Sequence, residues 1–387
     1  MLEVLAVEGY RSLRQLIVPL GEVTVVTGPN GAGKSSLYRT LRLLADMARN
    51  GAIGSLAAEG GLPSTLWAGP ETPPRAGEPL QGTVRKRPVG LRFGFSGSEF
   101  GYAADLGLPK PSDSSFCLDP EIKVEAIWAG PRLRRSTVLT ERQGPTVRVR
   151  GDEGWQVVAN NLKPYDSMLS EVADPGLAPE VLRVREQVRS WRFYDHLPTD
   201  PAAPARVAHP ATRTPRLAAD GADLAAALQT IEEMGDAEAL EATIARAFPG
   251  SRLEIGRPRS GWLDLGMRQP GMLRTLGVAE LSEGTLRYLL LTAALLSPRP
   301  AELLVLNEPE AHLDPSLLAP LAELIVGAAE PTQVIVVSHS SALVEALGGG
   351  PTDGTRVRSI RLVKEQGETR IEGLGFLDEP SWEWPGR

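Results

Sequence analysis

A glycine-rich segment near the start of the chain has the residues and spacing of a phosphate-binding loop. Residues 28–35 (GPNGAGKS) match G-x-x-x-x-G-K-[ST], between an apolar segment that predicts a strand and a helix-forming segment. Glycines let backbone N–H groups turn inward around an anion, and the N-terminus of the following helix adds partial positive charge. Lys34 is predicted to reach the β- and γ-phosphates, and Ser35 to coordinate Mg²⁺. The other residues expected to line the nucleotide are Asn30, Gly31, Gly33 and Ser36.

The apolar segment 303–308 (LLVLNE) ends in two residues that could take part in hydrolysis, Asn307 and Glu308. In enzymes with such a loop, this place holds an acid for the Mg²⁺ shell and then a Glu that polarises the attacking water. Glu308 fits the second role. Asn307 stands at the first position as a metal-shell residue, but its amide adds no negative charge. We therefore expect weak Mg²⁺ retention or slow turnover, unless another carboxylate compensates.

His339 follows the next apolar strand, 333–337 (QVIVV), so it is expected at the same carboxyl edge of a parallel sheet. An imidazole there can contact a γ-phosphate or the attacking water. Its alternative is an incidental surface position. Upstream, Ser282 and Gly284 stand at the start of a predicted helix in the sequence ELSEGTLR, a pattern that a plain helix N-cap also uses.

The elements that must position these residues change character along the chain. Strands are predicted at 2–7 and 22–27, and a helix at 34–49; residues 51–88 are rich in Gly and Pro and predict loops. Short alternating segments between 91 and 150 predict an antiparallel meander. Helices are predicted at 177–192, 221–233 and 236–247, and an irregular loop at 197–220. From residue 284 onward helices alternate with strands, which predicts parallel strands joined by helices.

Composition sets outer limits on the class of protein. The chain has 387 residues, one Cys and a formal net charge of −7. One Cys excludes a disulfide framework and favours a reducing, cytoplasmic location. The first residues lack the basic region of a signal peptide, and no apolar run is long enough for a membrane span, so no membrane partner is expected. The acidic balance argues against a protein that coats nucleic acid by charge alone, but it leaves room for a local basic groove.

In order, these motifs resemble those of the ABC-type ATPases of the RecF/SMC/OLD group, and most of all the stand-alone bacterial RecF-like AAA-family ATPases. The resemblance is carried by GYRSL (9–13), by residues 28–44 and by residues 281–315. It implies an ABC-type ATPase head with a mixed sheet, flanking helices and an antiparallel meander, together with bound ATP and Mg²⁺. It also implies that Arg11 touches nucleotide phosphates, because related heads use the Arg of this segment in that way. Residues 280–287 resemble the signature motif of ABC-type ATPases, which implies that Ser282 faces a γ-phosphate and that Ser282, Gly284 and Asp314 act across a head-to-head homodimer.

Two departures from the family pattern shape the expected organisation. No Gln suits a Q-loop, and Lys34 lies far from Ser282 in sequence, which argues against a transporter ATPase. We expect an N-terminal lobe at 1–164, a compact helical lid at 165–250 and a C-terminal lobe at 251–387.

The expected function is ATP-driven dimerisation coupled to nucleic-acid repair or anti-phage defence through a separate effector. Arginines at 132–150 and 183–192 are candidate DNA or RNA contacts, or simply solvated side chains. The alternative function is a slow nucleotide-dependent switch or scaffold that regulates an effector and needs no nucleic acid.

Overall fold

The computed structural model describes residues 1–49, 51–71, 90–111, 113–257, 260–348, 357–375 and 378–387. The chain forms two compact units. Unit 1 contains Met1–Gly21, Thr27–Trp191 and Ile360–Arg387, and unit 2 contains Glu22–Val26 and Arg192–Ser359. None of the helices in the described ranges has the length and apolar character needed to cross a membrane.

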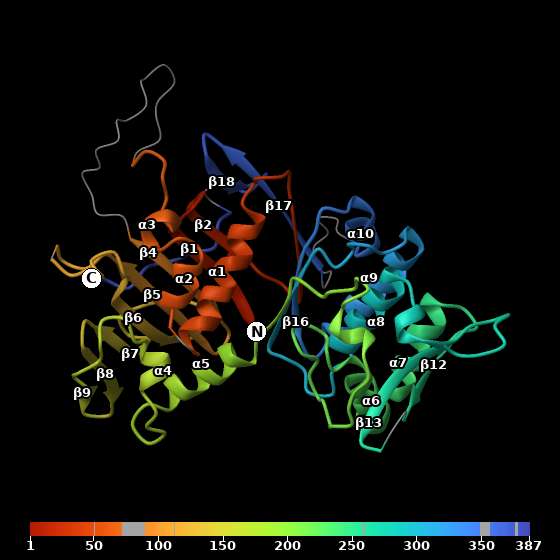
Figure 1. The fold of residues 1–387 in the computed structure, drawn as a ribbon. Helices are drawn as coiled ribbons and strands as arrows, with labels where there is room; N and C mark the ends of the chain where they lie inside the picture. Colours follow the sequence, from red (N-terminus) through yellow and green to blue (C-terminus); the bar gives the residue numbers. More distant parts are fainter. Residues whose placement is uncertain (50, 72–89, 112, 258–259, 349–356, 376–377) are drawn as a thin grey trace. The chain divides into compact units, whose positions relative to one another are not determined.

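Unit 1 is built on an eight-stranded antiparallel sheet in the order β2-β1-β4-β5-β6-β7-β8-β9 (Figure 1). Its strands are β1 (Leu2–Tyr10), β2 (Leu13–Pro19), β4 (Leu91–Gly97), β5 (Phe100–Gly107), β6 (Glu121–Ala129), β7 (Val138–Gln143), β8 (Thr146–Gly151) and β9 (Gly154–Ala159). The helices are α1 (Lys34–Met47), α2 (Ile53–Ala58), α3 (Leu62–Thr65), α4 (Met168–Glu171) and α5 (Pro179–Ser190), and the hairpin of β17 (Val357–Glu365) and β18 (Glu368–Ile371) follows late in the chain. The predicted meander is confirmed.

Packing on this sheet follows the alternation of its strands. Helix α1 buries Leu37, Leu41 and Leu44, which recur at helical spacing on one side of the helix. On the sheet, small side chains such as Ala103 and Ala126 leave room for Trp382 and Trp384 from the end of the chain.

The segment between β3 and β4 differs from the sequence prediction. Short helices α2 and α3 stand where loops are predicted, while residues 72–89 lie outside the described range.

Unit 2 is built on parallel strands in the order β10-β15-β16-β3. These are β10 (Arg192–Tyr194), β15 (Leu303–Asn307), β16 (Gln333–Val337) and β3 (Val23–Thr27). Strands β3, β15 and β16 are almost entirely buried and carry near-continuous apolar runs, as parallel strands covered on both faces do. A small antiparallel sheet contains β11 (His209–Pro210), β12 (Arg252–Gly256), β13 (Trp262–Arg268) and β14 (Leu276–Gly277).

The remaining elements of unit 2 are helical and cover its sheets (Figure 1). They are η1 (Pro204–Arg206), α6 (Leu224–Met234), α7 (Ala237–Ala247), η2 (Val278–Glu280), α8 (Glu283–Leu295), η3 (Pro315–Leu317), α9 (Leu318–Ala328) and α10 (Ser341–Ala346). Helix α8 is buried on nearly all sides, with one core shared by α6, α8, α9 and the parallel strands. The predicted alternation of helices and parallel strands in the last third of the chain is confirmed.

The segment 165–250, expected to form one helical lid, is divided between the two units. Residues up to Trp191, with α4 and α5, belong to unit 1, and those from Arg192 onward belong to unit 2. Within it, β10 is a strand of the parallel sheet rather than part of a helical insertion. Trp191, Phe193 and Tyr194 are buried, as core anchors are.

Candidate functional site

The phosphate-loop sequence in unit 1 has the backbone geometry of an anion cradle. Helix α1 begins at Lys34, and Gly33 precedes it at the N-cap position with a φ of 104° and no side-chain capping bond. Gly31 also has a positive φ, of 77°, a conformation that glycine adopts without steric cost. The first N–H groups of a helix have no partner within the helix, so this uncapped turn offers donors to an anion.

The Lys34 side chain bridges the loop that it follows. It is 5% exposed, and its Nζ donates to the carbonyl oxygens of Gly28 at 2.5 Å and Pro29 at 2.9 Å. An ammonium held at the mouth of the loop can exchange these carbonyls for phosphate oxygens. Ser35, Asn30 and Gly31 are exposed. Ser36 is buried, and its carbonyl accepts a hydrogen bond from Thr40 Oγ1 at 2.9 Å.

The β17–β18 hairpin supports the loop from behind. Thr369 Oγ1 lies 2.8 Å from both the Ala32 carbonyl oxygen and Ser12 Oγ. A Cβ at position 33 would stand 2.3 Å from that Thr369 hydroxyl, so only glycine fits there. Gly28 is equally constrained, because its Cβ would lie 2.3 Å from the Leu362 carbonyl oxygen. The two glycines therefore serve close packing as well as the backbone turn.

Arg11 is held by an acid that sequence reasoning missed. It has a φ of 51°, and its Nη2 and Nε donate to Glu59 Oε2 at 2.6 and 3.1 Å. Tyr10 donates its hydroxyl to the same oxygen at 2.6 Å. Burial, followed by this hydrogen bond, raises the pKa of Tyr10. No local pattern relates Glu59 to Arg11 in sequence, since the two meet only through the packing of α2.

In unit 2, the carboxyl ends of three parallel strands lie side by side. Val337 of β16 pairs with Val26 of β3 on one side and with Asn307 of β15 on the other. The phosphate loop follows β3 directly in the chain, Glu308 follows β15, and His339 follows β16. The predicted placement of Asn307, Glu308 and His339 at one sheet edge is therefore what the structure shows.

Glu308 is fixed through its backbone and exposed through its side chain. Its N–H donates to the Val337 carbonyl at 2.8 Å, and its own carbonyl accepts from Arg287 Nη2 at 3.0 Å. Its φ is 48°, a left-handed conformation that is uncommon for a residue other than glycine and is held by its surroundings. The carboxylate lies 3.3 Å from His339 Nε2, with the side chains 50% and 39% exposed. A carboxylate and an imidazole in direct contact and open to solvent can share the handling of one water or one proton.

Glu310 organises the turn that carries His339. Its Oε1 accepts hydrogen bonds from Ser338 Oγ at 2.6 Å, the His339 N–H at 2.9 Å and the Ser340 N–H at 3.2 Å. Its Oε2 is buried and has no hydrogen-bond partner among the described residues. The sequence signal for Glu310 is a second acid two positions after Glu308, and this spacing alone does not indicate a contact with the turn at His339.

Arg287, on helix α8, backs the same turn. Besides Glu308, its guanidinium donates to the Leu197 carbonyl at 3.1 Å, and its Nε is buried without a partner. Burial lowers the pKa of Arg287, and the negative charges of Glu310 and Glu308 oppose that shift. The buried guanidinium of Arg287 therefore lies close to both Glu308 and Glu310. Its direct hydrogen bond goes to the backbone carbonyl of Glu308.

Ser282 and Gly284 lie at the N-terminus of α8, and Gly284 packs against the segment that follows Glu308. Ser282 caps α8 by accepting the Thr285 N–H at 3.1 Å, so the N-cap alternative describes its contact in this structure. A Cβ at Gly284 would lie 2.7 Å from the His312 carbonyl oxygen, so this position requires glycine. Asp314 caps η3, and hydrogen bonds from the Ser316 hydroxyl and N–H lower the pKa of its carboxyl group.

The predicted site residues thus form two groups, one in each unit. Unit 1 holds Arg11, Asn30, Gly31, Gly33, Lys34, Ser35 and Ser36; unit 2 holds Ser282, Gly284, Asn307, Glu308, Asp314 and His339. In the described parts of the chain, no three His, Cys, Asp or Glu side chains gather as a metal site.

Most of the arginines proposed as nucleic-acid contacts have partners within the protein. On α5, Arg183 pairs with Glu99 at 2.7 Å, and Arg189 donates to the Ala48 carbonyl at 2.8 Å. On β8, Arg148 and Arg150 lie over the Trp155 ring, at 4.9 and 5.2 Å from its centroid. These contacts favour the structural interpretation of the two clusters.

Comparison with known proteins agrees with this geometry. Residues 23–151 and 156–345 match the family model AAA_21, described as "AAA domain, putative AbiEii toxin, Type IV TA system". No curated protein matches the chain. Among solved structures, an Smc head bound to the C-terminal winged-helix domain of ScpA is 15% identical, with 96% of each chain covered and a TM-score of 0.50. The SMC head domain from Thermotoga maritima is also 15% identical, with 96% of this chain and 97% of that chain covered and a TM-score of 0.48.

The first of these likenesses shows the fold alone, a mixed α/β architecture like that of an SMC head. The family match covers well over half of the chain and includes the phosphate loop, the signature segment, Glu308 and His339. The protein therefore belongs to the AAA_21 family.

Proposed function

We propose that this protein is a Mg²⁺-dependent ATPase whose two copies close head to head around ATP. The observation that carries the proposal is the Glu308–His339 contact of 3.3 Å at the carboxyl edge of the parallel sheet. The neighbouring strand at that edge, β3, leads directly into the phosphate loop. In open α/β sheets, ligands bind at such edges.

The phosphate loop fits the nucleotide that its family implies. The uncapped N-terminus of α1 supplies N–H donors, and Lys34 already lies across the loop against two neutral carbonyls. Lys34 would exchange these for β- and γ-phosphate oxygens, Asn30, Gly31, Gly33 and Ser36 would line the phosphates, and the exposed Ser35 hydroxyl would join the Mg²⁺ shell. ATP supplies the phosphoanhydride bond, and Mg²⁺ supplies compensating positive charge.

At the sheet edge, Glu308 would orient and polarise the attacking water, and His339 would hold a γ-phosphate oxygen or the same water. Asn307 would reach a metal-bound water through its amide oxygen. Glu310 would act as a positioning residue, because it fixes the backbone of His339 without lying at the exposed edge itself. Ser282, Gly284 and Asp314 would serve the nucleotide held by the second copy, and Arg11 would contact phosphates after leaving Glu59.

The test of the dimer is Glu308→Gln with Mg-ATP, followed by light scattering. Slowed hydrolysis should trap the ATP-bound pair, so the mass should double relative to the nucleotide-free protein. Glu302→Gln, at the other end of the same strand, is the matched control and should stay monomeric under turnover. A Glu308→Gln protein that binds ATP and remains monomeric would show that the heads do not close.

We also propose a defence or repair role exercised through a separate effector. It is supported by the family description, which names a toxin of a toxin–antitoxin system. Stimulation of turnover by DNA or RNA would favour the repair interpretation, and co-purification with the product of an adjacent gene would identify the effector.

A slow nucleotide-dependent switch is the second candidate function. It is favoured by Asn307, which removes one negative charge from the expected Mg²⁺ shell. Tight ATP binding with near-zero turnover, unchanged by DNA, would favour the switch over an ATPase that hydrolyses ATP continuously.

A further inference from the structure

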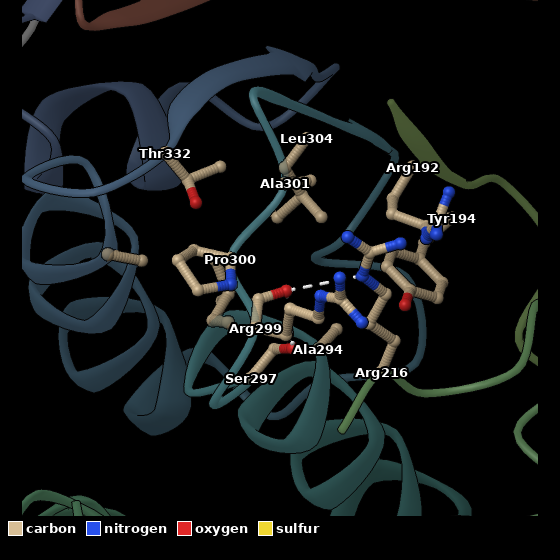
Figure 2. A pocket seen from close by; sticks show the side chains of 12 residues that line it. Arg192, Tyr194, Arg216, Ala294, Ser297, Arg299, Pro300, Ala301, Leu304 and Thr332 are labelled. Atoms are coloured by element: carbon tan, nitrogen blue, oxygen red, sulfur yellow. Dashed lines mark hydrogen bonds between the residues drawn. The ribbon is translucent and has the colours of Figure 1, made fainter. Parts of the chain in front are cut away.

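Three arginines converge on a small pocket in unit 2, away from Glu308 and His339. Arg192 opens β10, Arg216 lies in the loop before α6, and Arg299 lies between α8 and β15 (Figure 2). The figure shows their side chains directed to one place, beside Tyr194 and Ser297. The three are far apart in sequence, so the fold alone assembles this cationic group.

None of the described residues that line the pocket is acidic. Within the described part of the chain, neither Arg216 nor Arg299 forms an ion pair, and the single side-chain hydrogen bond of Arg216 runs from Nε to the Arg299 carbonyl at 3.4 Å. The Nη atoms of Arg216 therefore stay available as donors. The ends of α8 and α9 also border the pocket, through Leu295 and Ala328. Each helix C-terminus contributes about half a negative charge, so together they offset only about one of the two positive charges of Arg216 and Arg299.

The size of the pocket limits what can enter it. Its volume is about 10 Å³, which is room for about one water-sized group. A nucleobase or an apolar side chain cannot enter, but one oxygen of an anion can, while its other oxygens meet the guanidinium groups at the mouth. The planar donor forks of Arg216 and Arg299 together match the several oxygens of a phosphate better than the two of a carboxylate.

We propose that Arg216 and Arg299, in the pocket that Arg192 also lines, form a binding site for a phosphate group, separate from the nucleotide site. The pocket lies at the amino ends of β10, β15 and β16, whereas Glu308 and His339 follow the carboxyl ends of β15 and β16. Strand β15 is five residues long, which separates the two ends by about 16 Å. The phosphate belongs either to a nucleic-acid backbone or to a small phosphorylated molecule, and the proposal does not depend on ATP hydrolysis.

The test compares arginine variants in a full-length Lys34→Ala background, which removes the phosphate-loop lysine as a competing phosphate ligand. Inorganic phosphate is titrated by calorimetry against chloride at constant ionic strength. Arg216→Ala with Arg299→Ala should weaken phosphate binding at least about tenfold, because two charge-assisted donors are lost. Arg213→Ala, an exposed arginine of the same segment outside the pocket, is the matched control and should bind within about twofold of the background.

Two further arms keep the test decisive. Arg299→Ala alone changes only an exposed side chain, so it tests the site even if the double variant misfolds. A fluorescent single-stranded oligonucleotide distinguishes the sources: parallel loss of its binding indicates a nucleic-acid backbone, and unchanged binding indicates a small phosphorylated ligand. Equal phosphate affinity in the pocket variants and in Arg213→Ala, or no phosphate binding in the Lys34→Ala background, would overturn the proposal.

Discussion

The two ends of the parallel sheet in unit 2 differ in how their charged side chains are held. At the carboxyl end, Glu310 accepts three hydrogen bonds through one oxygen, and the backbone of Glu308 is fixed at both N–H and carbonyl. At the amino end, Arg216 and Arg299 share one hydrogen bond and form no ion pair within the described part of the chain, and none of the described lining residues is acidic. Fixed geometry is what bond-breaking chemistry requires, whereas unneutralised charge suits the capture of an ion.

This difference also separates two kinds of evidence for function. Glu308 and Glu310 are held in a fixed geometry, so a displacement of about an ångström should reduce catalytic activity. The arginines would act through their charge, so salt and competing anions should weaken the binding of an anion there. Variants at the two ends of one strand therefore test whether position or charge dominates at each.

The largest effect is expected from Glu308→Gln. Loss of a carboxylate that polarises water should reduce kcat by roughly 10²- to 10⁴-fold, with KM for ATP nearly unchanged, because the side chain acts on the water rather than on substrate binding. Steady-state phosphate release is the measurement. Glu302→Gln, at the amino end of β15, should retain turnover. Equal losses in the two variants would mean that the carboxyl end has no special role.

A smaller effect is expected from Glu310→Ala. It leaves the Ser338 hydroxyl and the N–H groups of His339 and Ser340 without their common acceptor, at a cost of about 1–3 kcal/mol in the free energy of unfolding. The displaced His339 should lower kcat roughly tenfold or more, with little change in KM. Glu310→Gln keeps one acceptor oxygen and should recover part of the activity. If Ala and Gln lower melting temperature and leave kcat alone, Glu310 serves stability only.

Glu310 also shows where prediction from sequence stopped. The phosphate loop, its flanking strand and helix, and the strand-end positions of Glu308 and His339 are local patterns, and the structure contains each of them. The three-donor contact of Glu310 joins two strand-end turns 28 to 30 positions apart, and only the parallel register of β15 and β16 brings it about. Glu59 and the arginine pocket depend on still longer loops, which carry no periodic signal.

Local patterns failed in a second way where a segment was short. The three residues of β10 are too few for a period to show, so the sequence pattern does not distinguish them from the helical insertion around them, although they pair with β15 in the parallel sheet. Helices α2 and α3 stand among glycines and prolines that favour turns. Tertiary packing decides such segments.

Restoring an acid at position 307 should change metal dependence by a moderate amount. In Asn307→Asp, a full negative charge next to the expected Mg²⁺ shell should lower the Mg²⁺ concentration for half-maximal turnover by several-fold, roughly 1 kcal/mol at an exposed edge. A magnesium titration of ATPase rate measures it, with Mn²⁺ as a second ion. An unchanged midpoint would mean that another carboxylate already serves, and Glu310 with its unpartnered Oε2 would be the first to examine.

The smallest effect is expected at the amino end of the sheet, where removing a side chain should raise the stability of the protein instead of lowering it. Arg299→Ala removes one of three converging positive charges, so in phosphate-free buffer of low ionic strength it should raise the stability of the protein by a few tenths of a kcal/mol. For a chain of this size that is a rise of about 1 °C or less in Tm, which should vanish in high salt because surface charges are then screened. Adding phosphate should reverse the order, since the wild-type site gains a ligand. Arg213→Ala, an exposed arginine outside the pocket, should show neither the gain nor the reversal. A lower Tm for Arg299→Ala at every salt concentration would mean that the arginines are compensated within the protein, and the contrast between the two ends of the sheet would no longer hold.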